Sequence, residues 1–176
     1  EDCQLTVMDK WLLSRLNTTV KAVDENLSAY KVPEAARALQ DFVDEMSNWY
    51  VRRCRERFWG KGMDDTKEAA FVTLYTVLVT LSKVIAPFVP FMAEEMYQNL
   101  VRSVDPTAPE SVHLCDFPTA DESLIDESLN TQMSALLSVV GLGRACRAAA
   151  NLKVRQPLST LYVKGTSFDE AFSALA

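Results

Sequence analysis

The residues best suited to chemistry are arginines and aromatic side chains gathered in residues 47–59. This segment reads Ser-Asn-Trp-Tyr-Val-Arg-Arg-Cys-Arg-Glu-Arg-Phe-Trp. Guanidinium groups donate paired hydrogen bonds to phosphate oxygens, and an exposed indole stacks on an unpaired base. In a helix, Arg52 and Arg55 lie three residues apart and point toward solvent. We therefore expect phosphate contacts from Arg52 and Arg55, with Trp59 available for stacking.

Two other arginines of the same segment continue an apolar stripe. Steps of three and four along residues 39–50 lead on to Arg53 and then to Arg57. A charge on such a face must be paired, unless the helix extends beyond the core. We favour structural ion pairs near the end of a bundle. The acidic partners that we consider are Asp9, Glu94 and Glu95.

A second basic region lies toward the C-terminus. Residues 129–168 contain no Asp or Glu, although the chain has 24 acidic and 18 basic residues and a net charge of −6. A solvated basic face is one interpretation, but such faces usually mix both signs, which favours an anion-binding surface. Steps of three and four place Arg144, Arg147 and Asn151 on one helix face, with Lys153 and Arg155 in the segment that follows. We expect all five to contact RNA phosphates.

Other kinds of site have little support. The chain has one histidine, His113, and its cysteines are scattered, so we expect no metal site and no catalytic residue. Cys115 shares a face with His113 in an extended segment, but no further group supports a nucleophile, and we interpret His113 as a partly buried loop residue. Scattered thiols and the lack of a long apolar run favour a cytoplasmic protein without a membrane partner.

Helical periodicity covers most of the chain and supplies the elements that must position these residues. Apolar residues recur at helical spacing from about residue 5 to 30, 39 to 50, 70 to 85, 91 to 103 and 130 to 150. Residues 158–163 alternate instead, which predicts a short strand. The predicted fold is all-α: an antiparallel bundle of four to five helices with a small strand-containing C-terminal extension. We place the bundle in residues 1–150 and the extension in residues 151–176.

Five motifs occur in a fixed order along the chain. The first three are Asp-Lys-Trp-Leu-Leu-Ser-Arg-Leu-Asn from residue 9, Phe-Val-Asp-Glu-Met-Ser-Asn-Trp-Tyr-Val-Arg-Arg from residue 42, and Ala-Pro-Phe-Val-Pro-Phe-Met-Ala-Glu-Glu-Met-Tyr from residue 86. They resemble the anticodon-binding domain of class I isoleucyl-, valyl- and leucyl-tRNA synthetases. Ser-Val-His-Leu-Cys-Asp-Phe-Pro from residue 111 and Asn-Leu-Lys-Val-Arg-Gln-Pro-Leu-Ser from residue 151 are similar to the isoleucyl enzymes in particular.

The resemblance implies a module that holds the anticodon stem and loop of isoleucine tRNA. The whole ligase would join isoleucine to this tRNA with ATP and Mg²⁺. Neither ATP-site signature of the family, His-x-Gly-His or Lys-Met-Ser-Lys-Ser, occurs here, so the resemblance implies a non-catalytic fragment without a cofactor of its own. Its partners would be the tRNA and the remainder of the synthetase chain. Two alternatives stay open: the same domain of a valyl enzyme, and a helical protein-interaction module whose arginines only keep its ends soluble.

Overall fold

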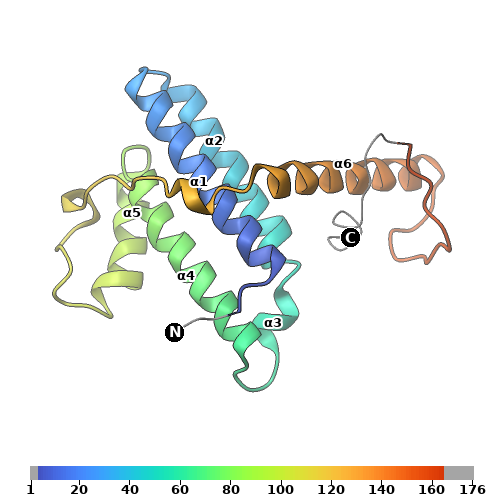
Figure 1. The fold of residues 1–176 in the computed structure, drawn as a ribbon, viewed down its shortest axis with the longest axis horizontal. Coiled ribbons are helices and arrows are strands. Elements are labelled where there is room, and N and C mark those ends of the chain that lie inside the picture. The colour runs from blue at the N-terminus through green and yellow to red at the C-terminus, as the bar shows by residue number, and fades with distance from the viewer. Residues whose placement is uncertain (1–3, 165–176) are drawn as a thin grey trace. The chain divides into compact units, whose positions relative to one another are not determined.

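The structure, a computed structural model, describes residues 4–164, and the described chain is mostly helical (Figure 1). The chain forms two compact units, Glu1–Ile125 and Asp126–Ala176. This division falls ahead of the boundary at residue 150 that we predict from the sequence. The last long helix thus groups with the segment after it.

Between residues 4 and 125 the first unit holds five α-helices, named in chain order. They are α1 (Val7–Ser28), α2 (Val32–Glu45), α3 (Arg55–Trp59), α4 (Asp65–Ile85) and α5 (Pro90–Tyr97). Two π-helical segments, Met46–Val51 and Gln98–Arg102, continue α2 and α5. The second unit holds α6 (Glu127–Ala149). The all-α fold class is therefore confirmed.

The strand predicted for residues 158–163 is wrong. These residues have no regular secondary structure, and residues 4–164 contain no strand at all. A strand is stable only when a neighbour satisfies its backbone groups, and the described part of the chain offers none. The part of the predicted extension after residue 164 lies outside the described residues.

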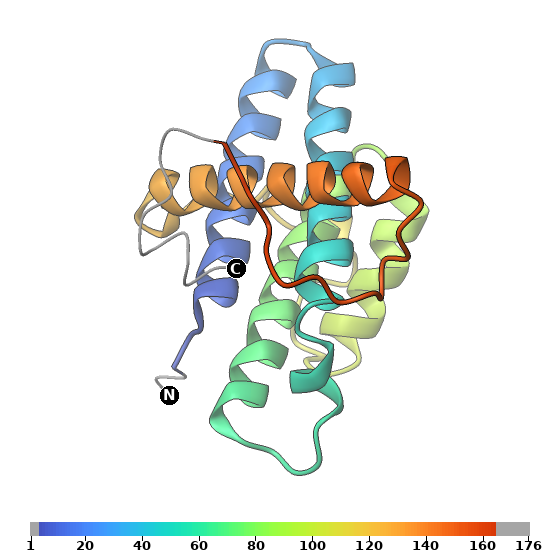
Figure 2. The ribbon, with the colours of Figure 1, turned by 90° about the vertical axis from the view of Figure 1, so that its right-hand side faces the viewer.

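The core of the first unit is built around α1. A capping box starts this helix: Thr6 Oγ1 accepts a hydrogen bond from Asp9 N, and Thr6 N donates to Asp9 Oδ2 over 2.8 Å. The buried face of α1 packs against α2 and α4. Figure 2 shows α1 and α2 side by side, joined by a short turn. The buried apolar residues of α1 are Trp11, Leu12, Leu16, Val20 and Val23.

The α4 helix is the most apolar element. By length and composition alone it could cross a membrane, contrary to the expectation from the sequence. Core helices of water-soluble proteins meet the same criterion. In this fold α4 packs against α1, α3 and α5, and Ala70, Val77 and Leu81 are buried. The bundle core thus accounts for part of this apolar composition, whereas Phe71, Val72 and Tyr75 of the same helix are exposed.

The turn between α1 and α2 contains a backbone conformation that suits few residues. Tyr30 has φ 58°, and its side chain is 92% exposed. The amide of Tyr30 donates to Leu27 O and that of Lys31 donates to Asn26 O, which is the pattern of a Schellman motif. Glycine usually holds this position because it has no Cβ to clash there. Tyrosine therefore adds strain where its side chain is largely in solvent.

We expect Tyr30→Gly to stabilise the chain by about 0.5 to 1 kcal/mol, because the relief of strain exceeds the added freedom of glycine in the unfolded state. Urea denaturation monitored by circular dichroism measures the change. Ala29→Gly is the matched control, because Ala29 has φ −90° and gains nothing from glycine. An unchanged or lower stability of Tyr30→Gly would show that the tyrosine side chain contributes to the fold.

Candidate nucleic-acid interface

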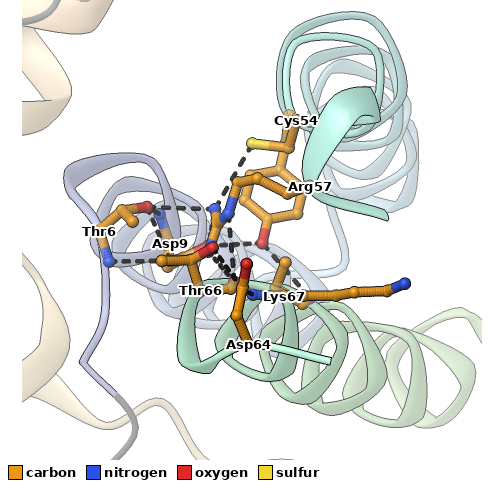
Figure 3. Close-up of polar contacts among 9 residues, drawn as sticks. Thr6, Asp9, Cys54, Arg57, Asp64, Thr66 and Lys67 are labelled. Atoms are coloured by element: carbon orange, nitrogen blue, oxygen red, sulfur yellow. Dashed lines mark hydrogen bonds and ion pairs between the residues drawn. The ribbon is translucent and has the colours of Figure 1, made fainter. Parts of the chain in front are cut away.

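A buried carboxylate anchors the basic segment of the first unit. Asp9 is fully buried, and its two oxygens accept five hydrogen bonds (Figure 3). Arg57 Nη1 and Nη2 each donate to one oxygen over 2.9 Å, which forms a bidentate ion pair. Tyr50 donates its hydroxyl to Asp9 Oδ1 over 2.6 Å, and Thr6 supplies the remaining two donors. The predicted ion pair of Arg57 is present, with Asp9 as its partner.

Arg57 also ties α3 to the start of α4. Its Nη2 and Nε donate to Thr66 O over 2.6 and 3.2 Å. Asp64 caps α4 by accepting from Lys67 N, and Lys67 Nζ donates back to the carbonyl oxygens of Gly60 and Gly62. One guanidinium thus joins the starts of α1 and α4 to α3. The short α3 helix is held in place mainly by side chains.

These contacts shift the pKa values of the groups involved. Burial raises the pKa of Asp9, but hydrogen bonds from Arg57, Tyr50 and Thr6 outweigh it and hold this pKa below its ordinary value. Burial and the hydrogen bond to Asp9 raise the pKa of Tyr50, so its hydroxyl remains a donor. Burial also raises the pKa of the Cys54 thiol. The cluster therefore holds one carboxylate and one guanidinium in charged form.

The structure differs from prediction at Arg53. The π-helix Met46–Val51 adds a residue to the turn, so the buried stripe passes from Tyr50 to Cys54 and then to Arg57. Cys54 is buried, whereas Arg53 lies on the exposed side. A regular α-helical phase places Arg53 on the buried face instead. The π-helix thus leaves Arg57 as the inward-facing arginine of this pair.

The outward side of this segment carries the predicted RNA contacts. Arg52, Arg55 and Trp59 are all exposed, and Trp59 is 70% exposed. Arg55 lies over the indole of Trp59, with its Cζ 3.9 Å from the ring centroid. This cation–π contact orders two long side chains in solvent. Phe58 faces the other way and meets Phe71 of α4 edge to face at 5.3 Å, which fixes the orientation of α3.

Glu94 and Glu95 do not serve as the predicted acidic partners. Glu94 accepts hydrogen bonds from Gln98 Nε2, Ser111 Oγ and Val112 N, over 2.7, 2.8 and 2.9 Å. The Gln98 and Ser111 side chains lower the pKa of Glu94. Glu95 is exposed and accepts from Asn99 Nδ2. Glu94 therefore holds the chain after α5 in place, because its carboxylate accepts hydrogen bonds from Gln98, Ser111 and Val112.

The second unit divides its predicted contact residues between two roles. Arg144, Lys153 and Arg155 are exposed, as an anion-binding surface requires. Arg147 is only half-exposed, and its Nη1 donates to backbone carbonyls of the segment after α6. Asn151 has φ 53° and follows the end of α6, where asparagine tolerates the left-handed conformation. Arg147 and Asn151 thus have structural roles in ending α6.

Sequence reasoning named Asp9 as a possible ion-pair partner but missed Thr6 and Tyr50, whose side chains also bind it. Thr6 and Asp9 have the spacing of a capping box, which would have marked Asp9 as pointing toward the start of α1. Tyr50 lies in an apolar stripe and its hydroxyl needed a partner, which was a second available signal. No sequence signal marks the Thr66 carbonyl. Among residues 4–164, no group of three or more His, Cys, Asp or Glu side chains could hold a metal ion.

The structure is thus a helical module with two groups of exposed basic side chains, one in residues 52–55 and one in residues 144–155. The family described as the anticodon-binding domain of tRNA ligase matches residues 9–162. Because this match covers most of the sequence, the chain belongs to that family.

Curated relatives give the same result. The isoleucine–tRNA ligase of Clostridium novyi (strain NT) is 55% identical over 94% of this chain, and that of Clostridium acetobutylicum is 57% identical over 89%. The isoleucine–tRNA ligase of Thermus thermophilus is 52% identical over 89% of this chain. The matched region makes up only 16%, 15% and 15% of these three relatives. The chain therefore corresponds in length to a single domain of these much longer relatives.

We expect Arg57→Met to lower the free energy of unfolding by about 3 kcal/mol, because it leaves the Asp9 carboxylate buried without its charged partner. Urea denaturation at neutral pH measures the loss. Arg52→Met is the matched control: it removes the same charge from an exposed position and should change stability by less than about 0.5 kcal/mol. Equal effects of the two variants would contradict the anchoring role of Arg57.

A pH series tests Asp9 itself. Its pKa is lower in the folded than in the unfolded chain, so unfolding takes up a proton below about pH 4. The stabilisation is present above that pH and is lost as the pH falls through the folded-state pKa. We expect the stability of Asp9→Asn, followed by urea denaturation from pH 7 to pH 2.5, to fall less steeply than that of the wild type. Parallel curves would show that another carboxylate carries the dependence.

Proposed function

We propose that this chain binds the anticodon stem and loop of isoleucine tRNA on behalf of a longer isoleucine–tRNA ligase. The observation that carries the proposal is the exposed Arg55–Trp59 pair beside Arg52, on a helix that Arg57 anchors to the buried Asp9 carboxylate. Family membership supplies the class of ligand, and the identity to isoleucine–tRNA ligases supplies the amino acid. The working location would be the cytoplasm, where tRNA is charged.

The chemistry of an RNA hairpin suits these surfaces. Its stem offers phosphates, and its loop offers bases that are free to stack. Exposed Arg52 and Arg55 provide donors for phosphates, and Trp59 provides a planar surface for one base. Phosphate contacts position the RNA, whereas contacts with base edges select its sequence. We therefore assign these residues to positioning rather than to anticodon discrimination.

The charge distribution supports a directed mode of binding. The chain as a whole is acidic, with a net charge of −6, while residues 129–168 are free of acids. A polyanion is thus attracted to particular surfaces and repelled by the rest. In the second unit we assign Arg144, Lys153 and Arg155 to phosphate contacts, because their side chains are exposed.

The activity of the whole ligase is also part of the proposal. Charging isoleucine onto tRNA would use ATP and Mg²⁺ at a site formed elsewhere in the ligase, since neither ATP-site signature occurs in this sequence. The chain described here would hold the tRNA so that its acceptor end reaches that site. Its partners are then isoleucine tRNA and the remainder of the synthetase.

Filter binding to unmodified isoleucine and valine tRNA transcripts tests the proposal. We expect binding that weakens steeply with rising salt, because neutralised phosphates release counterions, and that favours the isoleucine transcript. Preference for the valine transcript would assign the chain to a valyl enzyme. Salt-insensitive self-association without RNA binding would instead support a protein-interaction module.

We expect the double variant Arg52→Ala, Arg55→Ala to bind isoleucine tRNA roughly tenfold or more weakly at moderate salt. The plot of log affinity against log salt should become shallower by about two, because two phosphate contacts are lost. Its thermal midpoint should stay unchanged, since both side chains are exposed. Filter binding and thermal denaturation measure the two quantities.

The matched control is Lys31→Ala, Arg37→Ala, which removes two exposed charges at the other end of α2. An equal loss of binding in this control would mean that the affinity depends on net charge alone. A large drop in the thermal midpoint of the Arg52, Arg55 variant would make those residues structural.

A further inference from the structure

The end of α6 is built to reverse the chain direction within a few residues. The amide of Leu152 donates to Arg147 O over 2.9 Å, and that of Asn151 donates to Ala148 O over 3.1 Å. With Asn151 at φ 53°, these bonds form a Schellman motif. Figure 2 shows the chain turning back after α6. The basic residues that follow are therefore placed by the geometry of this turn.

The Arg147 side chain closes the next turn. Its Nη1 donates to Gln156 O over 2.8 Å and to Lys153 O over 3.0 Å, and it lies 3.5 Å from Val154 O. The backbone amide of Gln156 in turn donates to Lys153 O over 3.0 Å. We call residues 153–156, which contain Lys153 and Arg155, the basic turn. Arg147 thus contacts the returning chain through both its carbonyl oxygen and its guanidinium.

Apolar packing contributes little to holding the basic turn in place. Val154 is 71% exposed, and Leu158 and Leu161 are 51% and 66% exposed. An open hollow of about 730 Å³ lies among α6 residues and the returning chain of the same unit. Within residues 4–164, little apolar surface is buried at the basic turn, and the hydrogen bonds from Arg147 are the main contacts that fix it.

We infer that Arg147 is a positioning residue for RNA binding: it holds the basic turn against the end of α6 so that Lys153 and Arg155 meet phosphates as a preordered pair. This inference rests on the proposed function. The Nη1 group of Arg147 is already engaged with carbonyls, so the Nη1–Nη2 edge is not free to bind a phosphate. In this inference Arg147 acts through the two exposed residues, whose ordering it completes before RNA arrives, and the triple variant below tests a direct phosphate contact through its Nε–Nη2 edge.

The experiment compares four variants of the chain in filter binding to unmodified isoleucine tRNA across a salt series. They are Arg147→Gln, Arg144→Gln, the double variant Lys153→Gln, Arg155→Gln, and the triple variant that adds Arg147→Gln to the double. We expect Arg147→Gln to weaken binding roughly tenfold at moderate salt. In the double variant, the slope of log affinity against log salt should become shallower by about two. The triple variant should bind no more weakly than the double, because Arg147 has nothing left to position.

Limited trypsin digestion tests the turn without RNA. Trypsin cleaves after Lys153 and Arg155, and a held turn must open locally before it is cut. We expect Arg147→Gln to speed cleavage at both sites severalfold relative to the wild type. Thermal midpoints should be equal for all variants, which separates local opening from global unfolding.

The outcomes distinguish a failure of this inference from a failure of the proposed function. A triple variant that binds more weakly than the double would make Arg147 a direct phosphate contact and overturn the inference. Unchanged binding or unchanged trypsin cleavage in Arg147→Gln would overturn it as well. If the double variant binds RNA like the wild type, the assignment of this surface in the proposed function fails, and the inference fails with it even if trypsin cleavage is faster.

Discussion

The first unit depends on a carboxylate that cannot be buried alone. A charged Asp9 without partners would cost several kcal/mol in the core, so the fold must bring donors to it. They come from three places: Thr6 at the start of α1, Tyr50 in the π-helix, and Arg57 in α3. Because Arg57 also holds the Thr66 carbonyl, one ion pair fixes where three helices begin or end.

That constraint explains why the arginines of one short segment have different roles. Arg57 must face inward to reach Asp9, and the π-helix brings Cys54 rather than Arg53 onto the same side. Arg52 and Arg55 are left facing solvent, with Arg55 stacked on Trp59. The same rotation of the helix therefore both turns Arg57 toward Asp9 and leaves Arg52 and Arg55 in solvent. A change in that rotation would alter both.

In both units, basic side chains donate hydrogen bonds to backbone carbonyl oxygens. Lys67 donates to the carbonyls of Gly60 and Gly62, and Arg147 donates to those of Lys153 and Gln156. In each case a loop without apolar support gains a polar anchor on a neighbouring helix. Such anchoring reduces the ordering that remains to be done when a ligand binds. Positive charge in this chain thus contributes to shape as well as to attraction.

The amino-acid sequence by itself determined the helices, the class of fold and the two basic regions. Helical periodicity and charge are local properties, and a capping box or a proline acts over a few residues. Only the tertiary structure decided which charged residues are structural. Asp9 and Arg57 are 48 residues apart, and the choice of Asp9 over Glu94 follows from where α1 and α3 meet. The exposed position of Arg53 and the missing strand at 158–163 have a similar cause: a π-helical turn and the absence of a partner strand are set by packing, which no local pattern records.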